Sequence, residues 1–350
     1  MKPFLTFLSS LLMALTLTAQ TSILHEPALS PDGSQLAFSY QGDIWTVPVS
    51  GGAASRLTIH ESYESGPVWS PDGKNIAFVG NRFGNNDVFV TTMAAGTPQR
   101  LTEHSASDNS PSWMGNDAVL FSTNRIFVQV ERSAETYQAS LGGGTPIRVM
   151  DAVGSEATPS PDGRYIAIVR GGCRVAREAY RGPANRDIWV YDKQTKTYTQ
   201  ITTDEGQDYH PTWTKDGMLT FLSARDGRYN LYQTKPAKGA AKTQLTKFKD
   251  WGIRNYSISA DGQTVAIEQG GAILVSKNGG KKFNEVNITV GGDFKFYPME
   301  EKTLTSGISD FDVSPNGKYL SMVSRGEVFV KFNDKEKTRT RNVSNHPYND

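Results

Sequence analysis

Short stretches of alternating apolar and polar residues run through the chain from about residue 24, and many of them follow the same turn. Residues 30–33, 70–73 and 160–163 all read Ser-Pro-Asp-Gly, and each leads into a stretch such as Leu-Ala-Phe or Ile-Ala-Ile. Proline presets φ at the first turn position, aspartate bonds its own backbone, and glycine tolerates the left-handed conformation. Each copy therefore predicts a β-hairpin between two antiparallel strands.

Weaker copies of this turn stand at four more places, residues 113–117, 214–217, 259–262 and 314–317. A third apolar stretch opens with an aspartate at Asp43, Asp87 and Asp187, and a fourth ends in Leu-Thr or Ile-Thr at residues 57–58, 101–102, 201–202 and 245–246. Four strands that recur about every 40 to 55 residues are typical of a propeller blade, which buries its faces only by stacking on other blades. The sequence therefore predicts an all-β fold, a β-propeller of four-stranded blades.

Seven copies of the turn leave two arrangements open. The first six units, within residues 20–290, each supply four strands, which favours a six-bladed propeller. Residues 291–304 are then a linker and residues 305–350 the first blade of a second, truncated propeller; a single seven-bladed ring is the alternative. Since no strand before Leu24 is available to complete the last blade, we expect the ring to close by packing of faces alone.

The amino terminus carries a signal for export. Lys2 precedes an apolar run at residues 4–17, and Ala19 offers a small residue for cleavage, so residues 1–19 are interpreted as a secretory signal peptide. The run is short for a membrane anchor, and we expect no other contact with a membrane. The chain is therefore expected to be exported to the periplasm.

Composition and missing motifs exclude several classes of function. The formal net charge of +1 gives no support for nucleic acid or an anionic membrane surface as a partner. Cys173 is the single cysteine, so neither an internal disulfide nor a cysteine-based zinc cluster is expected. The sequence lacks the Gly-x-Ser-x-Gly nucleophile elbow, the Walker loop and a complete dinucleotide fingerprint. We expect no catalytic residues, no metal and no cofactor in this chain.

Two groups of ring-bearing side chains recur at equivalent positions. Trp69, Trp113 and Trp213 each stand just before the turn of their blade, which favours packing between blades over an aromatic binding strip. His60 and His104 each fall two residues after a Leu-Thr pair. A metal site would need such histidines to converge, whereas equivalent positions in different blades are spread around the axis. Structural or surface roles are the expected ones.

An arginine-rich insertion in the fourth unit is the most informative stretch for binding. The candidate residues, on residues 174–186, are Arg174, Arg177, Tyr180, Arg181 and Arg186. Guanidinium groups bind a peptide carboxylate through two parallel hydrogen bonds, which gives one function for this insertion. The other, which we favour, is to brace blade four against a neighbouring domain or subunit.

A second candidate surface lies on the linkers that lead from an outer strand to the next inner strand. These segments carry acids, among them Glu64, Asp108 and Asp208. We expect them near the mouth of a central channel, where an acidic rim would attract peptide amino termini or a cation. The alternative is that they are ordinary charged loops.

The turn and Leu-Thr repeats resemble those of TolB-type periplasmic propellers, and also those of the N-terminal region of tricorn protease and its bacterial homologues. Three stretches resemble tricorn more closely: Tyr-Arg-Gly leading to an Ile-Trp strand at residues 180–189, Asp-Ile-Trp at residues 43–45, and residues 320–326. The resemblance covers essentially the whole mature chain but only the front third of such a protease.

The resemblance implies a function without chemistry of its own. In the tricorn family a second propeller, a PDZ-like domain and a serine protease domain follow this region, and the catalytic residues lie far beyond it. It therefore implies a peptide-gating or docking module. Its partners would be peptides, the protease and PDZ-like domains of a longer chain or other subunits, and further copies in a homo-oligomer. The alternative is a stand-alone TolB-like propeller that binds a protein in the periplasm.

Overall fold

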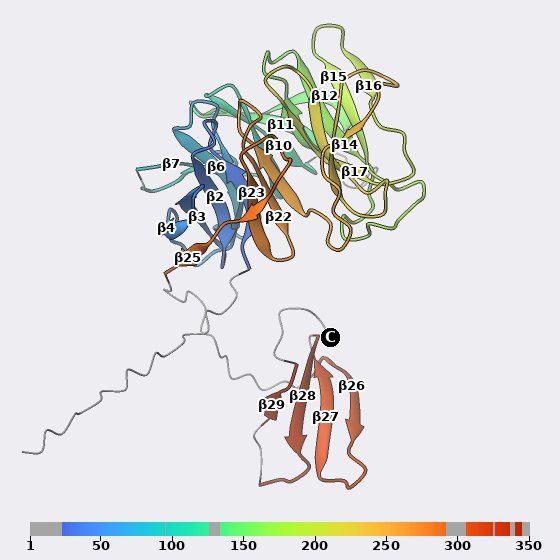
Figure 1. Cartoon of the computed structure of the whole chain (residues 1–350). Helices are drawn as coiled ribbons and strands as arrows, with labels where there is room; N and C mark the ends of the chain where they lie inside the picture. Colours follow the sequence, from blue (N-terminus) through green and yellow to red (C-terminus); the bar gives the residue numbers. More distant parts are fainter. Residues whose placement is uncertain are drawn as a thin grey trace, which may run out of the picture. The chain divides into compact units, whose positions relative to one another are not determined.

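The chain forms two compact units, Met1–Asp293 and Phe294–Asp350, and every element described is a β-strand (Figure 1). The computed structural model describes residues 23–94, 96–125, 134–291, 306–324, 326–336 and 340–344. The predicted signal peptide lies outside these residues, as does the linker apart from residue 291.

The described part of the first unit holds six sheets, which we number as blades one to six, and in each the strands follow chain order. Blade one holds β1 (His25–Leu29), β2 (Gln35–Tyr40), β3 (Asp43–Pro48) and β4 (Gly52–Arg56). Blade two holds β5 (Glu64–Trp69), β6 (Asn75–Gly80), β7 (Asp87–Thr92) and β8 (Gln99–Arg100). Blade three holds β9 (Asp108–Met114), β10 (Ala118–Thr123), β11 (Glu135–Ser140) and β12 (Ile147–Val153).

The second half of the unit repeats this order. Blade four holds β13 (Ser155–Pro159), β14 (Tyr165–Arg170), β15 (Asp187–Asp192) and β16 (Thr197–Gln200). Blade five holds β17 (Asp208–Trp213), β18 (Leu219–Ser223), β19 (Asn230–Thr234) and β20 (Thr243–Gln244). Blade six holds β21 (Asn255–Ile258), β22 (Val265–Gln269), β23 (Ala272–Ser276) and β24 (Asn284–Glu285).

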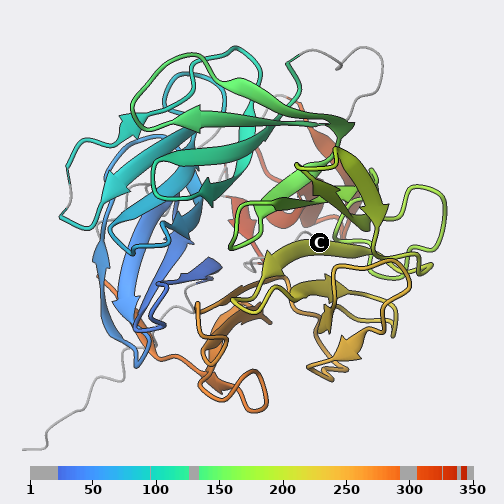
Figure 2. The ribbon, with the colours of Figure 1, turned by 90° about the horizontal axis from the view of Figure 1, so that it is seen from above.

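The blades are arranged around a central axis (Figure 2). Their first strands contact one another in the order β1, β5, β9, β13, β17, β21, and β21 contacts β1 again. The first strand of every blade therefore lines the axis, and the fourth lies at the outside. The predicted all-β propeller of four-stranded blades is confirmed.

The repeated turn folds as its residue types require. In blade one, Ser30 Oγ donates to Asp32 Oδ1 at 2.5 Å and accepts the backbone N–H of Gln35 at 2.9 Å. Gly33 follows at a φ of 70°. The same serine-centred pair of bonds recurs at Ser70, Ser160, Ser259 and Ser314. The turn thus fixes which residue begins the second strand, and with it the register.

The hydrophobic core lies between the blades. One buried cluster joins Ala37 and Ile44 of blade one to Ile76 and Phe78 of blade two. The three repeated tryptophans pack against such clusters, and each indole N–H donates to a carbonyl of the preceding blade's first strand: Trp69 to Ala28 at 3.0 Å, Trp113 to Val68 at 3.0 Å and Trp213 to Thr158 at 2.9 Å. They pack between blades, as the sequence predicted.

The strands around the axis are bulged. Blades one to five each have a residue with positive φ inside or beside an irregularity of the first strand, namely Glu26, Gly66, Ser110, Glu156 and His210. A bulge leaves backbone groups without ladder partners. At three of these positions a carboxylate of the preceding blade accepts the N–H: Glu26 Oε2 from Gly66 at 2.7 Å, Glu156 Oε2 from His210 at 2.8 Å and Glu268 Oε2 from Glu26 at 2.9 Å.

The expectation that the ring closes by packing of faces alone is wrong. Blades six and one do pack face to face, but hydrogen bonds also cross the seam. His25 Nδ1 lies 2.9 Å from Glu268 Oε1, which raises the pKa of His25, and Ser257 Oγ accepts the N–H of Leu29 at 2.9 Å. Beyond blade six, β25 (Ile288–Val290) pairs parallel with β4 and adds a fifth strand to blade one. The ring is therefore closed by backbone pairing as well as by packing.

The second unit is a single sheet in its described residues. It holds β26 (Ile308–Val313), β27 (Tyr319–Ser324), β28 (Glu327–Phe332) and β29 (Thr340–Asn342), again in chain order. Its apolar side chains are only partly covered, and Phe311 is 69% exposed. That this sheet begins a second propeller remains a prediction.

Two neighbouring glycines allow a test of how much the pairing of β25 with β4, here called the β25 clasp, contributes to stability. Gly51 and Gly52 both have positive φ, so an alanine at either position strains the backbone by about 1 kcal/mol. A Cβ on Gly51 would lie 2.5 Å from the carbonyl oxygen of Asn287, whereas a Cβ on Gly52 meets nothing within 4 Å. We expect Gly51→Ala to lower the free energy of unfolding in urea by at least about 1 kcal/mol more than Gly52→Ala. Equal losses would mean that the clasp contributes nothing to stability.

Candidate functional site

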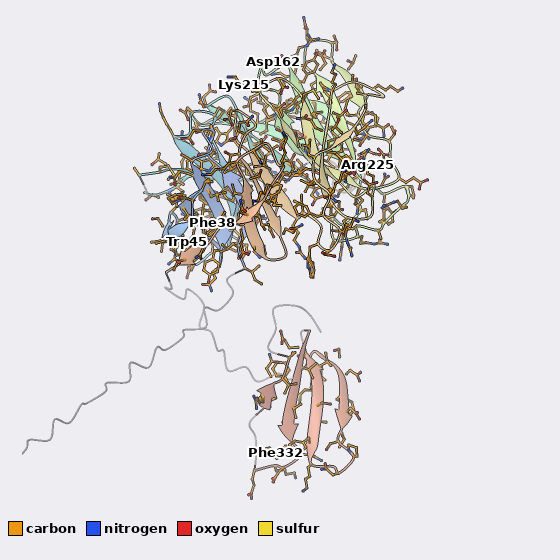
Figure 3. The ribbon with its side chains drawn as sticks, viewed as in Figure 1. Phe38, Trp45, Asp162, Lys215, Arg225 and Phe332 are labelled. Atoms are coloured by element: carbon orange, nitrogen blue, oxygen red, sulfur yellow. The ribbon has the colours of Figure 1, made fainter. Side chains whose placement is uncertain are left out.

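The two ends of the ring differ in what they present. Linkers between blades and the turns from second to third strands lie at one end of the strands, which we call the linker end. The Ser-Pro-Asp-Gly turns lie at the other, the turn end. Asp162 and Lys215, in the turns of blades four and five, lie on the same side of the unit (Figure 3). All candidate residues predicted from the sequence belong to the linker end.

The predicted acidic rim is wrong for its three residues. Glu64, Asp108 and Asp208 are fully buried. Each pairs with an arginine that follows the second strand of its own blade: Glu64 with Arg82 at 2.5 Å, Asp108 with Arg125 at 2.8 Å and Asp208 with Arg225 at 3.2 Å. Burial raises the pKa of Asp208 to about 6, against the opposing charge of Arg225. These carboxylates hold the linker end together and are not available to a ligand as an exposed rim.

The arginine-rich insertion lies across blade five. Arg181 donates to the carbonyl oxygen of Ala224 at 2.8 Å, and Tyr229 Oη donates to that of Val175 at 2.8 Å. Gln207 Nε2 donates to the carbonyl oxygen of Arg177 at 2.7 Å. The insertion therefore braces blade four against blade five of the same ring; a contact with another domain or subunit stays a prediction.

The arginines of the insertion divide into two pairs. Arg181 and Arg186 are committed to the ring, because Arg186 donates to the carbonyl oxygen of Cys173 at 2.8 Å and to Glu156 Oε1 at 3.1 Å. Arg174 and Arg177 are exposed. The guanidinium of Arg177 lies 4.8 Å from the ring centroid of half-buried Tyr180. The exposed pair is the part of the predicted site that could reach a ligand.

Exposed apolar side chains at the linker end were missed by sequence reasoning. Ile59 and Tyr63, on the linker from blade one to blade two, are 75% and 54% exposed, and Phe83, on the turn between β6 and β7, is 61% exposed. Asn81 Oδ1 accepts the N–H of Tyr63 at 2.8 Å and ties the two segments together. Burial and the charge of Glu26 raise the pKa of the Tyr63 phenol. Large apolar residues in otherwise polar linkers were the available signal.

A serine–histidine pair at this end resembles a nucleophile and its base. Ser62 Oγ lies 2.9 Å from His60 Nδ1, which also accepts the N–H of Ser62 at 3.0 Å. The equivalent His104 Nδ1 accepts the N–H of Ala106 at 2.9 Å, so the loop is capped in the same way without a serine. Asp43 accepts the backbone N–H of His60, whereas a catalytic triad needs its acid on the imidazole. The pair is a loop cap.

A buried aspartate at the start of the third strand has a repeated set of partners. In blade one Asp43 binds Arg56 at 2.5 Å, and in blade two Asp87 binds Arg100 at 2.7 Å. The repeated threonine accepts the backbone N–H of the residue that follows the aspartate. In blade two, Thr102 Oγ1 accepts the N–H of Val88 at 3.0 Å. The Leu-Thr repeat therefore anchors the outer strand to the third strand.

Blade four departs from this pattern. Gln200 replaces the arginine, and its Nε2 lies 3.3 Å from Asp187 Oδ2. Without the cation, burial raises the pKa of Asp187 to about 6. Shifted carboxyl pKa values often mark functional sites. Here the repeat supplies a structural cause, because blades one and two, whose third strands also open with an aspartate, have an arginine at this place.

The described part of the chain contains no group of three or more His, Cys, Asp or Glu side chains arranged to hold a metal ion. It also contains no helix with the length and apolar character needed to cross a bilayer.

Comparisons with known proteins agree with the repeats. Residues 14–282 match the family described as the tricorn protease N-terminal β-propeller domain. A tricorn protease homologue of Saccharolobus solfataricus is 23% identical over 306 residues, which are 85% of this chain and 27% of the relative. The crystal structure of the tricorn protease has a TM-score of 0.67 at 18% identity and covers 94% of this chain and 32% of its own. TolB from Acinetobacter baumannii has a TM-score of 0.57 at 19% identity, over 72% of this chain and 63% of its own.

This chain corresponds to only part of these two relatives. It spans about a quarter of the length of the archaeal relative and about a third of the tricorn protease chain. At identities below 25%, the two solved structures show the fold.

Because Gln200 stands in blade four where blades one and two have an arginine, an arginine at this position should stabilise the fold in a pH-dependent way. A carboxyl whose pKa is higher in the folded state destabilises the fold as pH rises from about 4 to about 6, and the full penalty applies above that window. Gln200→Arg should restore the missing cation. Because Asp187 is only half-buried, we expect a gain of about 1 kcal/mol in the free energy of unfolding at pH 7.5 and little gain at pH 4.5.

The matched control is the reverse change in blade two. Arg100→Gln should lower the free energy of unfolding, and the loss should be larger at pH 7.5 than at pH 4.5. Urea unfolding of both variants at the two pH values measures these effects. A gain for Gln200→Arg that is the same at both values would show that the charge of Asp187 is not its cause.

Proposed function

Because this chain belongs to the family of the tricorn protease N-terminal β-propeller domain, we propose that it is a non-catalytic propeller that binds peptides. In this proposal it guides them to or from a serine protease domain within a larger protease assembly. The chain itself supplies a rigid ring and a binding surface at the linker end. We also propose that the apolar run at its amino terminus directs it to the periplasm.

The observation that carries the peptide-binding proposal is the composition of the linker end. Exposed apolar side chains lie there at Ile59, Tyr63 and Phe83, and exposed cations lie at Arg174 and Arg177. Aromatic residues and arginine are the types enriched where proteins bind one another. An extended peptide offers both apolar side chains for the first group and a carboxylate for the second. The buried ion pairs around Glu64 and Asp208 hold these loops in place.

A stand-alone, TolB-like propeller is the second candidate. The likeness to TolB from Acinetobacter baumannii supports it at the level of the fold. Such a protein would bind a folded partner in the periplasm, whereas the first candidate binds short, unstructured peptides. Affinity for short peptides is therefore what separates the two.

The direct test measures binding and turnover on the same sample. Residues 20–350 are purified and titrated into fluorescently labelled peptides of about ten residues, and the mixtures are then analysed for cleavage products. We expect saturable binding and no cleavage, both with the unchanged chain and with Ser62→Ala. Cleavage that persists through repurification would contradict the proposal, and cleavage lost in Ser62→Ala would make the loop cap a nucleophile.

Two arginines of the insertion provide matched variants. Arg177 is exposed, so Arg177→Ala should weaken peptide binding about threefold to tenfold and leave the free energy of unfolding unchanged. Arg181 donates to three carbonyl oxygens, so Arg181→Ala should lower the free energy of unfolding by about 1 kcal/mol and leave binding nearly unchanged. If Arg181→Ala weakened peptide binding more than Arg177→Ala did, and Arg177→Ala lowered stability more, Arg181 would be the binding residue and Arg177 the structural one.

A further inference from the structure

One gap between blades lacks the side chain that fills three of the others. The residue before the repeated turn is Trp69 in blade two, Trp113 in blade three and Trp213 in blade five. Each fills the gap to the preceding blade and donates to its backbone. In blade six the equivalent residue is Ile258. The gap between blades five and six therefore has a smaller side chain where three other gaps have an indole.

Two more gaps lack the tryptophan but are filled in other ways. Blade four has Pro159 at this position, and the gap to blade three is occupied by a cluster that includes Met150 and Tyr191. Blade one has Leu29, and the gap to blade six is occupied by a cluster that includes Trp45 and Val47. Side chains of other strands therefore fill the space in both gaps, among them Met150 on β12, Tyr191 on β15 and Trp45 on β3.

A buried cluster that includes Tyr229 and Tyr256 also packs between blades five and six, but beside Ile258, at the turn end of this gap, a pocket of about 560 Å³ remains. Ile258 lines it together with Leu245 and buried Val265. Lys215 and Asp261, both exposed, also line it and belong to the first turns of blades five and six. The pocket thus has apolar walls with charges at the mouth, and its volume is within the range of sites that bind small ligands.

A buried hydroxyl in this pocket has no hydrogen-bond partner among the described residues. Thr220, on β18, is fully buried and lines the pocket, and its Oγ1 is unpaired. Buried polar groups in native proteins are almost always hydrogen-bonded, and an exception calls for a missing partner. A ligand with an apolar body and a polar atom would both fill the space and satisfy this hydroxyl.

We propose that this pocket binds an aromatic side chain of a peptide, in the place that a tryptophan of the chain itself occupies in three other gaps. The choice of a peptide as ligand rests on the proposed function; the choice of an aromatic group rests on the pocket alone. The charged mouth fits the main chain that carries such a side chain, because Lys215 can donate to its carbonyl oxygens and Asp261 can accept from its N–H groups. The ring would then contact a peptide at its turn end as well as at its linker end.

The test fills the pocket from within. Ile258→Trp restores the residue found in the other blades, and Lys193→Trp adds a tryptophan on an exposed turn of blade four as the control. N-acetyl-tryptophanamide is titrated into residues 20–350 and into both variants, and the methyl groups of Leu245 and Val265 are followed by NMR. We expect saturable shifts of these methyls in the unchanged chain and in Lys193→Trp, and none in Ile258→Trp. A Trp-containing peptide should bind Ile258→Trp about tenfold more weakly.

Other outcomes separate the pocket from the wider proposal. Shifts that persist in folded Ile258→Trp, or the lack of any saturable shift in the unchanged chain, would overturn the pocket assignment. Peptide binding that is the same with alanine in place of tryptophan would also overturn it while leaving the proposed function intact. Binding of N-acetyl-tryptophanamide with no peptide binding would contradict the proposed function and leave the pocket. If Ile258→Trp does not fold, Thr220→Val replaces it and should weaken binding about threefold, and equal binding would contradict the role of the hydroxyl.

Discussion

The hydrogen bonds from bulged inner strands to carboxylates of neighbouring blades are the constraint on which the ring depends. Each bulge turns a first strand at the axis and leaves a backbone N–H without a ladder partner. Glu26, Glu156 and Glu268 accept such N–H groups across blade boundaries. A hydrogen bond to a charged acceptor stabilises by about 1.5–3 kcal/mol, and an unpaired buried group costs a similar amount. At these three of the six boundaries, neighbouring blades are therefore joined at the axis by bonds that neither blade can make alone.

Hydrogen bonds of the same kind close the ring. Glu268 of blade six accepts the N–H of Glu26, and Glu26 in turn accepts that of Gly66, so blades six, one and two are linked in series. On the outside, β25 pairs with β4. The loops at the linker end stand on this frame, held by buried ion pairs such as Arg82 with Glu64. The loops at the linker end can thus expose side chains for binding while the buried ion pairs keep those loops in place.

The sequence predicts local features well because a few neighbouring residues determine them. The Ser-Pro-Asp-Gly turn and the repeated tryptophans carry their own geometry, and both are found as expected. Contacts between distant segments were not predictable in this way. Nothing near Ile288 marks it as a partner of Gly52, and the burial of Asp208 depends on Arg225 folding back across the end of a strand. The acidic rim failed for that reason.

Photo-crosslinking locates a bound peptide on the ring and so tests whether the linker end binds it. A peptide of about ten residues that carries a photoreactive phenylalanine analogue is bound to residues 20–350, irradiated, and the attachment sites are mapped by mass spectrometry. We expect attachment to the segments that contain Tyr63, Phe83 and Arg177, besides any attachment in the turn-end pocket beside Ile258. Attachment confined to an outer strand such as β16 would contradict binding at the linker end.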